Sequence, residues 1–311
     1  EVESDATILS SEEVLSVYPE TGWAAIRTVP DDPAQDVAFL FRSSPYGSIG
    51  HSHANNNDFI LHVAGHAMVM PSGYYDHYGS PHHRHWVWHT KSHNCVTLSD
   101  APQLLRSADS RGAIELVHDD DRLIYFRGNA DAAYATRAER CRRHVVFLKR
   151  QCCFVLIDEF RARPGVESAF QWNLHSWSRF HVDPSKQRFV LRREGSRLEG
   201  HLMWHTGGFF SVTEGWDPPP SPCTGSELQR EWRPQHHLRF TPLDMKAQVN
   251  FAAILCPSHA GLEPAVVRTV MTGGGEAAHV GGDLILIEQF EPTDADDKDQ
   301  GALAVLIVQG Q

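Results

Sequence analysis

Short runs of β-branched and aromatic residues, each bounded by turn-forming residues, recur along almost the whole chain, and helical periodicity is nearly absent. Many short strands without helices between them favour stacked antiparallel sheets. We therefore predict an all-β fold, a β-sandwich or supersandwich. The predicted strands are Val37–Phe41, Phe59–Val63, Ala67–Met70, Cys95–Leu98, Ala113–Val117, Leu123–Arg127, His144–Leu148, Phe154–Ile157, Ala169–Leu174, Phe189–Leu191, Leu198–Trp204, Val249–Leu255, Ala265–Val270, Leu284–Ile287 and Leu303–Val308.

The one helical signal lies near the start of the chain. Ser10 and Glu13 have the spacing of a capping box, ahead of apolar residues that begin at Val14 and continue to Val17. This pattern predicts a short helical turn after Ser10.

Two stretches interrupt the strand pattern and suggest how the chain is divided. At 311 residues the chain is long enough for about two domains or one large all-β domain. The triple proline within Gly215–Pro222 cannot pair in a central strand, so we place a boundary there. The acidic stretch Glu291–Gln300 is typical of a solvated loop. We expect a large antiparallel sandwich over residues 1–222 and a smaller sheet unit over 223–311.

Charge and cysteine usage narrow the class of protein. Lys and Arg number 28 against 39 Asp and Glu, a formal charge of −11, which argues against a general surface for nucleic acid or anionic membranes. No apolar stretch approaches the roughly 20 residues of a membrane helix. The six cysteines have no framework spacing, so we expect them to be reduced and buried. Because the chain begins at Glu1, without an initiator Met or a signal segment, we expect a processed product or a piece of a longer protein.

Ten of the 20 histidines fall between His51 and His93, and this segment is where we expect the chemistry. In an extended strand, side chains two residues apart share a face, so His51 and His53 would project together. Such a pair is typical of half of a metal site, of a proton-transfer pair, or of two polar residues on a wet sheet face. The pattern alone does not choose among these.

A loop rich in aromatic and basic residues follows. Between Ser72 and Trp86 the chain packs three tyrosines, four histidines and an arginine among glycine and proline residues. Loops of this kind usually present functional groups. The composition suits a polar, anionic, sugar-like ligand, with rings for stacking and imidazole or guanidinium groups for a carboxylate. An aromatic-rich surface loop is the alternative.

Several ordered motifs carry a family resemblance. GSIGHSHANNNDF, SGYYDHYGSPHHRHW, TKSHNCVTL, RRHVVFLKRQCCFVLIDEF and FQWNLHS resemble the heparinase II/III-like C-terminal domain of polysaccharide lyases, nearest to the oligo-alginate and heparin lyases. The similarity runs from about Gly22 to about Pro257. It implies a bacterial enzyme, secreted or periplasmic, in which an N-terminal (α/α) toroid packs against β-sandwich sheets around the active site. None of the toroid is recognisable here, so this chain would be the β-sheet portion, and activity would depend on the missing helical domain.

The resemblance also implies the reaction. Lyases of this kind bind uronate-containing polysaccharides or oligosaccharides and cleave them by β-elimination, in which the C5 proton is removed and the C4 oxygen leaves. The carboxylate must be neutralised and the enolate-like intermediate stabilised, and a Tyr or His transfers the proton. The family implies no required cofactor, although a structural zinc ion occurs in it.

Site residues follow from the resemblance position by position. His51 matches the family histidine that faces the substrate, as base or carboxylate neutraliser. His53 and His93 match metal ligands, but Pro71 stands where the family has a further Asp ligand. The remaining candidates are Tyr75 for proton transfer, together with Asn55, Asn56, Tyr74, Tyr78, His83 and Arg84 for substrate contact.

Other residues favour a structural role. The basic run Arg137, Arg140, Arg142 and Arg143 might face a polyanion, but alternation along a strand would turn half of it to an outer solvated face. We expect His175 to be a satisfied sheet histidine. We also expect three tryptophans to belong to the core, namely Trp172, Trp177 and Trp204.

Three other functions remain open. A uronate C5-epimerase would use the same intermediate, and a non-catalytic carbohydrate-binding module would use only the binding surface. A metallohydrolase is suggested by the HSH pattern alone, and Asn57 and Asp58 do not supply the Asp and His that it would need.

Overall fold

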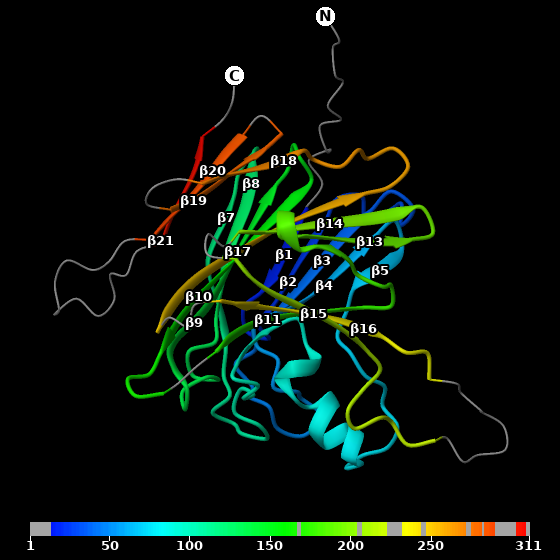
Figure 1. Cartoon of the computed structure of the whole chain (residues 1–311), viewed down its shortest axis with the longest axis vertical. Coiled ribbons are helices and arrows are strands. Elements are labelled where there is room, and N and C mark those ends of the chain that lie inside the picture. The colour runs from blue at the N-terminus through cyan, green and yellow to red at the C-terminus, as the bar shows by residue number, and fades with distance from the viewer. Residues whose placement is uncertain are drawn as a thin grey trace, which may run out of the picture.

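The fold was obtained as a computed structural model, which describes residues 14–166, 169–203, 207–222, 232–243, 247–271, 275–281, 283–289 and 303–308. Over these residues the chain forms four antiparallel sheets and three helical segments of one short turn each (Figure 1). The helical segments are η1 (His83–Val87), η2 (Thr90–Ser92) and η3 (Pro184–Lys186). The predicted all-β class is confirmed.

Two of the sheets form the main sandwich. The five-stranded sheet has the order β1 (Leu15–Tyr18), β2 (Trp23–Arg27), β3 (Val37–Arg42), β4 (Asp58–Val63) and β5 (His66–Val69). The eight-stranded sheet has the order β12 (His181–Asp183), β13 (Arg188–Arg193), β14 (Ser196–Met203), β17 (Gln248–Ser258), β10 (Cys153–Ala162), β9 (Ala138–Leu148), β8 (Leu123–Asn129) and β7 (Ala113–Asp119).

Two smaller sheets complete the fold. One has the order β15 (Gly208–Glu214), β16 (His236–Pro242), β11 (Phe170–Ser176) and β6 (Val96–Leu98). The other has the order β18 (Val267–Met271), β19 (Gly275–Val280), β20 (Asp283–Gln289) and β21 (Leu303–Val308).

The main core lies between the five-stranded and eight-stranded sheets. In β3 every second residue is buried, so Phe39 and Phe41 point toward the large sheet. The rings of Phe39 and Phe154 are 4.7 Å apart and nearly parallel, and Phe126 packs edge-on against Phe41. These contacts hold the two sheets face to face, as in other β-sandwiches.

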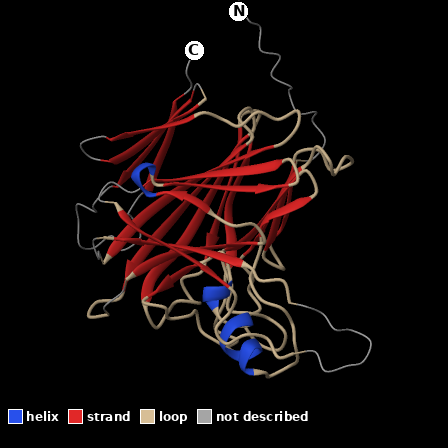
Figure 2. Ribbon diagram, turned by 45° about the vertical axis from the view of Figure 1, so that its right-hand side comes forward, coloured by secondary structure: helices blue, strands red, loops and turns tan. Residues whose placement is uncertain are grey.

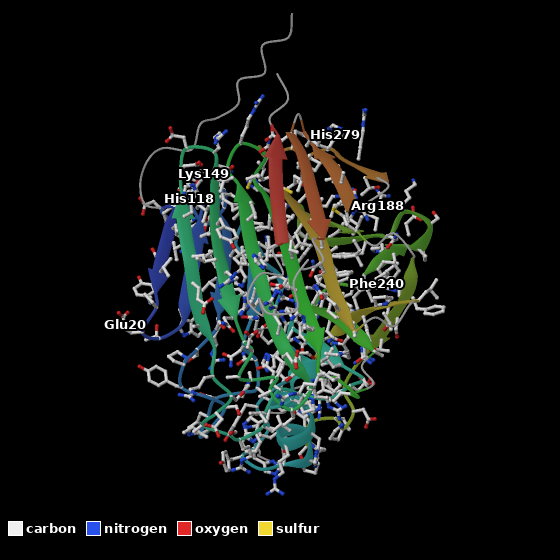
Figure 3. All side chains as sticks on the ribbon, turned by 90° about the vertical axis from the view of Figure 1, so that its left-hand side faces the viewer. Glu20, His118, Lys149, Arg188, Phe240 and His279 are labelled. Carbon is white, nitrogen blue, oxygen red and sulfur yellow. The ribbon has the colours of Figure 1, made fainter. Side chains whose placement is uncertain are left out.

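The opposite face of the large sheet carries a second apolar layer. Val146 on β9 and Val155 on β10 pack with Ala278 and Val280 of β19 and with Ile285 of β20. Figure 3 looks onto this face, with the orange and red strands of the small sheet in front of the large one, between His279 and Lys149. The eight-stranded sheet is therefore the middle of three layers, and β10 and β17 are buried along most of their length.

Two expectations need correction. Residues 15–18 form β1, an edge strand that pairs Leu15 with Ile26, because pairing with β2 outweighs the local helix signal; Ser10 and Glu13 lie outside the described residues. The expected boundary after Pro222 does not separate the sheets, since β16 pairs with β11 while β17 lies between β14 and β10 (Figure 1). The acidic stretch 291–300 and Trp204 lie outside the described residues.

One buried ion pair connects the large sheet to the loops below it. Arg143 on β9 has no solvent exposure, and its Nε and Nη2 donate to the Asp158 carboxylate on β10 at 2.7 and 2.9 Å. Its Nη1 donates to the backbone oxygens of Asn57 at 2.7 Å and Asn94 at 2.6 Å. Burial alone would lower the pKa of Arg143, but Asp158 raises it above the ordinary value, so the guanidinium is charged.

Arg143 and its neighbour Arg142 give a matched pair of variants. We expect Arg143→Gln to lower the free energy of unfolding by about 3–5 kcal/mol, because it leaves the Asp158 carboxylate buried without its partner. Arg142 points to the other face and pairs with Asp131 where both side chains are partly exposed, so Arg142→Gln should cost about 1 kcal/mol or less. Denaturant titrations of both variants check this, and equal losses would contradict it.

Candidate active site

The loop between β3 and β4 carries the predicted histidine pair at one end of the sandwich, where Figure 2 shows the long loops and two of the helical segments gathered. His51 and His53 lie in turn and loop conformation, so the expectation that they share a strand face is wrong. The loop is fixed by Asn56, which is buried and uses both ends of its amide, accepting from Ser44 N and donating to Ser110 O, each at 2.8 Å. Substrate contact by Asn56 stays a prediction, and the structure shows its amide bound within the loop scaffold.

The second loop, between β5 and β6, is held by a short hydrogen-bonded turn. Ser80 Oγ donates to Asp76 at 2.7 Å and accepts from the backbone N–H of His83 at 2.9 Å, which starts η1. Asp76 also accepts from the backbone N–H of Ser221 at 2.8 Å. Burial alone would raise the pKa of Asp76, but these hydrogen bonds lower it to about 2.

The proline-rich stretch 215–222 braces this loop. His82 Nδ1 donates to the Pro218 carbonyl at 2.7 Å, and its Nε2 accepts from the Tyr74 backbone N–H at 3.4 Å, which fixes the neutral tautomer. The stretch that the sequence suggested as a boundary therefore packs on the loop that carries the aromatic candidates.

Four of the predicted residues meet on these loops, three at the surface and His83 buried beneath them. Tyr75 and Tyr78, both more than half exposed, contact the His83 ring with centroids 5.1 and 5.3 Å apart. The ring of His51 lies 6.1 Å from that of Tyr78. Beneath them His83 packs on Trp88 at 4.3 Å. We call His51, Tyr75, Tyr78 and His83 the imidazole–phenol cluster.

The protonation of His83 follows from its contacts. The backbone N–H of Gly79 donates to His83 Nδ1 at 2.9 Å, so the proton of the neutral ring is on Nε2. Burial lowers the pKa of His83, and nearby His82, His51 and Arg106 lower it further against the opposing charge of Asp76. His83 is therefore a neutral hydrogen-bond donor at pH 7.

A cavity of about 220 Å³ has a lining that includes His53, His93, Asp58, Arg42 and Pro71 but none of the four cluster residues. Burial lowers the pKa of His53 to about 3, and His93, His83 and Arg42 contribute in the same direction. The cavity therefore combines a neutral imidazole with the Arg42 guanidinium, whose donors suit a carboxylate-bearing ligand, and with the Asp58 carboxylate, which has the opposite charge.

His93 and Asp58 form a buried hydrogen-bonded pair on the cavity wall. His93 Nδ1 donates to Asp58 Oδ2 at 2.8 Å, and Nε2 faces the Val87 carbonyl at 3.2 Å. The other Asp58 oxygen accepts from the backbone N–H groups of Phe59 and Asn94, both at 2.9 Å. Burial would raise the pKa of Asp58, but His93 and these hydrogen bonds hold it below its ordinary value.

These contacts bear on the predicted metal ligands. His53 and His93 do meet, with ring centroids 5.3 Å apart, and Pro71 lines the same cavity. Both ring nitrogens of His93 and both oxygens of Asp58 are engaged in hydrogen bonds, and Pro71 offers no side-chain ligand. No group of three or more His, Cys, Asp or Glu among the described residues could hold a metal ion. This donor set does not fit a zinc ion, so we derive no step through one.

The other candidates lie apart from the cluster or at its edge. Tyr74, predicted to contact substrate, packs among Trp177, Trp216 and Trp232, and its hydroxyl donates to the Arg233 carbonyl at 2.9 Å. Asn55 lines the cavity and donates to Asp58 at 3.2 Å.

Arg84 is exposed on η1, and its guanidinium lies beside Gly79. No carboxylate within the described ranges forms an ion pair with Arg84. Its position leaves the guanidinium available to a ligand but outside the ring contacts of the cluster.

Of the residues expected to be structural, His175 and Trp172 follow the expectation, whereas the expectation that Trp177 belongs to the core is wrong. His175 is buried, and its Nε2 donates to the His93 carbonyl at 3.1 Å while its Nδ1 lies 2.9 Å from His237 Nδ1. Trp172 is fully buried in the core, whereas Trp177 is half-buried in the tryptophan group around Tyr74.

Sequence reasoning missed two cations of the site. Arg106 donates to the Tyr78 hydroxyl at 3.4 Å, and its guanidinium lies 4.3 Å from the centre of the Trp88 ring. Arg42, at the end of β3, donates to Asn55 Oδ1 at 2.5 Å. Arg42 ends an apolar strand just before the HxH loop, which is a usable signal, whereas nothing in the residues around Arg106 marks it.

Solved structures with the same architecture define the fold class. A mutant of heparan sulfate lyase HepC from Pedobacter heparinus matches with a TM-score of 0.68 and 16% sequence identity over 96% of this chain and 43% of the lyase. A heparinase III gene product matches with a TM-score of 0.67 and 14% identity over 95% of this chain and 42% of that protein. The chain thus spans less than half the length of these lyases and has the fold of their β-sheet part.

The family model for the heparinase II/III-like, C-terminal domain matches residues 12–239, and the chain belongs to this family. No curated protein sequence matches the chain significantly. Within the described parts of the chain, no helix is long and apolar enough to cross a membrane.

The buried neutral histidines predict acid sensitivity. Burial lowers the pKa of His53 to about 3 and those of His89 and His237 to about 4, so the unfolded chain binds more protons than the folded one below about pH 6.5. Stability from these groups is present above that pH and is lost as the pH falls toward 4, by up to about 1.4 kcal/mol per pH unit for each histidine.

We expect His53→Gln to flatten this loss of unfolding free energy between pH 6.5 and 4. His118→Gln provides the control, because it makes the same substitution at a histidine that is exposed on β7 (Figure 3). Denaturant titrations at each pH check both variants, and a wild-type slope in His53→Gln would contradict the argument.

Proposed function

We propose that the chain is the β-sheet part of a polysaccharide lyase that cleaves uronic-acid-containing glycans by β-elimination. The observation that carries this proposal is the imidazole–phenol cluster, in which His51, Tyr75 and Tyr78 reach solvent. His53, two residues after His51 in the same loop, lines a cavity together with Arg42. Membership of the heparinase II/III-like family supports the class of reaction. The similarity to heparan sulfate lyases supports an anionic polysaccharide as substrate.

The residue types fit the steps of the elimination. A base removes the C5 proton, the electron pair forms the C4–C5 double bond, and the C4–oxygen bond breaks as the leaving oxygen takes a proton. His51 acts as the base or neutralises the carboxylate, and Tyr75 transfers a proton. Arg42 and neutral His53 stabilise the negative charge that moves onto the carboxylate as the proton leaves.

Binding residues surround this pair. Tyr78 and His83 contact the sugar ring, Asn55 lies at the cavity, and Arg84 reaches a carboxylate from η1. No cofactor enters this scheme. We further propose that an N-terminal (α/α) toroid supplies the rest of the cleft and that the protein works outside the cytoplasm.

Two substitutions test the catalytic assignments. We expect His51→Ala and Tyr75→Phe each to lower kcat by about 10²–10⁴-fold, because each removes a proton-transfer group while Tyr75→Phe keeps the ring. The measurement is the ultraviolet absorbance of the unsaturated product on a panel of uronate polymers. It is made with this chain and with the whole protein that contains it.

Tyr46→Phe is the matched control, because Tyr46 is exposed but has no ring contact with the cluster. Full activity in His51→Ala would contradict the proposal. Exchange of the C5 hydrogen with solvent without an unsaturated product would instead indicate a uronate C5-epimerase. Binding with neither change would indicate a carbohydrate-binding module.

A further inference from the structure

A second polar pocket lies on the face of the large sheet that points away from Arg143. Residues 140, 142 and 144 of β9 alternate with Arg143 and continue the face that Val146 presents to the small sheet. Figure 3 shows the small sheet over the part of this face near Lys149. Farther along β9, away from Lys149, the face opens into a pocket of about 570 Å³.

Arginine dominates this pocket. Its lining includes Arg140, Arg142, Arg161 and Arg163, with Asp131 and Glu139 as the acidic residues. Four guanidinium groups face two carboxylates of the lining and the buried Glu159 behind Arg140, in a chain whose formal charge is −11. The pocket is therefore a local basic site on an acidic protein.

The available carboxylates are already used by two of the arginines. Arg142 donates to Asp131 at 3.0 and 3.2 Å, and Arg140 donates to the buried Glu159 at 2.6 Å. No carboxylate of the described residues forms an ion pair with Arg161 or Arg163.

The register between β9 and β10 places two of these arginines opposite each other, which is unfavourable. Arg161 on β10 lies directly opposite Arg140 on β9 as a cross-strand pair. Like charges at opposed positions destabilise a sheet. Arg163 donates to the Ala135 carbonyl at 2.6 Å and so keeps its charge at the rim. An anion beside Arg161 and Arg163 would offset the repulsion from Arg140 and accept hydrogen bonds from these two guanidinium groups.

We propose that this pocket binds an oxyanion, a sulfate or carboxylate group carried by an acidic saccharide, at a site separate from the imidazole–phenol cluster. Guanidinium groups present paired N–H donors that match both groups. The choice of a saccharide as carrier rests on the proposed function, whereas the oxyanion specificity rests on the pocket itself. The pocket would hold a second segment of a polyanionic chain.

Calorimetric titration at low ionic strength tests the site. All proteins carry His51→Ala, so that the probes are not cleaved. The probes are inorganic sulfate, a heparin tetrasaccharide with sulfate and carboxylate groups, and a hyaluronan tetrasaccharide with carboxylates alone. We expect Arg161→Ala/Arg163→Ala to weaken tetrasaccharide binding at least about tenfold. The two tetrasaccharides together distinguish sulfate from carboxylate as the bound group.

Arg179→Ala/Arg192→Ala is the matched control, because it removes the same charge from exposed positions outside the pocket. We expect it to weaken binding less than about twofold. Equal weakening in both double variants, or none in the pocket variant, would overturn the proposal.

Thermal unfolding without ligand gives a second readout. Because Arg161 opposes Arg140, Arg161→Ala should leave Tm at or above the wild-type value, whereas a fall of several degrees would mark Arg161 as a structural residue and overturn the proposal. If the pocket variant alone loses tetrasaccharide affinity while the whole protein forms no unsaturated product, the oxyanion site is upheld and the proposed function is refuted. The two failures are therefore distinguishable.

Discussion

The arrangement of the candidate site depends on the buried ion pair of Arg143 and Asp158. The pair sits in the middle layer of the sandwich, and the third donor of Arg143 holds the carbonyls of Asn57 and Asn94. Asn57 precedes Asp58 and Asn94 follows His93 in the chain. The Arg143 guanidinium therefore fixes the backbone next to both residues of the hydrogen-bonded His93–Asp58 pair on the cavity wall. Removing one partner of a buried ion pair is strongly destabilising, because the other charge is left buried without compensation. Through Arg143, the large sheet thereby positions the two loops that contain Asn57 and Asn94.

The histidines divide into two physical groups. His53, His93 and His175 are buried or nearly so; burial lowers the pKa values of His53 and His175, and His93 is hydrogen-bonded to Asp58. His51 stands at the surface beside Tyr78, where solvent and a ligand can reach it. A histidine-rich segment thus serves the loop scaffold as much as the chemistry. The proposed proton-transfer role belongs to the exposed ring, because only that ring can meet a ligand.

The fold could be predicted largely from the sequence, because alternating apolar residues report directly which face of a strand is buried. Val37–Phe41 and Phe59–Val63 lie within β3 and β4 for this reason. β15 was missed because its residues are mostly exposed, and β1 because its neighbour β2 decides its structure. The site is harder to predict from the sequence. Strand alternation does not apply to His51 and His53, because they lie in a turn and a loop. The partners of Tyr74 and Arg106 come from distant segments of the chain, which periodicity does not report. The resemblance identified the cluster residues that periodicity could not.

The central position of β17 has a consequence for how the chain is made. β17 pairs with β10 on one side and with β14 on the other, yet its residues, 248–258, come late in the sequence. Until they leave the ribosome, β10 and β14 both present open strand edges, and such edges recruit other chains. The last third of the chain therefore closes the middle layer. A nascent chain that ends before β17 would expose the unpaired edges of β10 and β14 and would lack Phe251, which packs in the aromatic core. Protection by chaperones during synthesis therefore matters most before β17 is made.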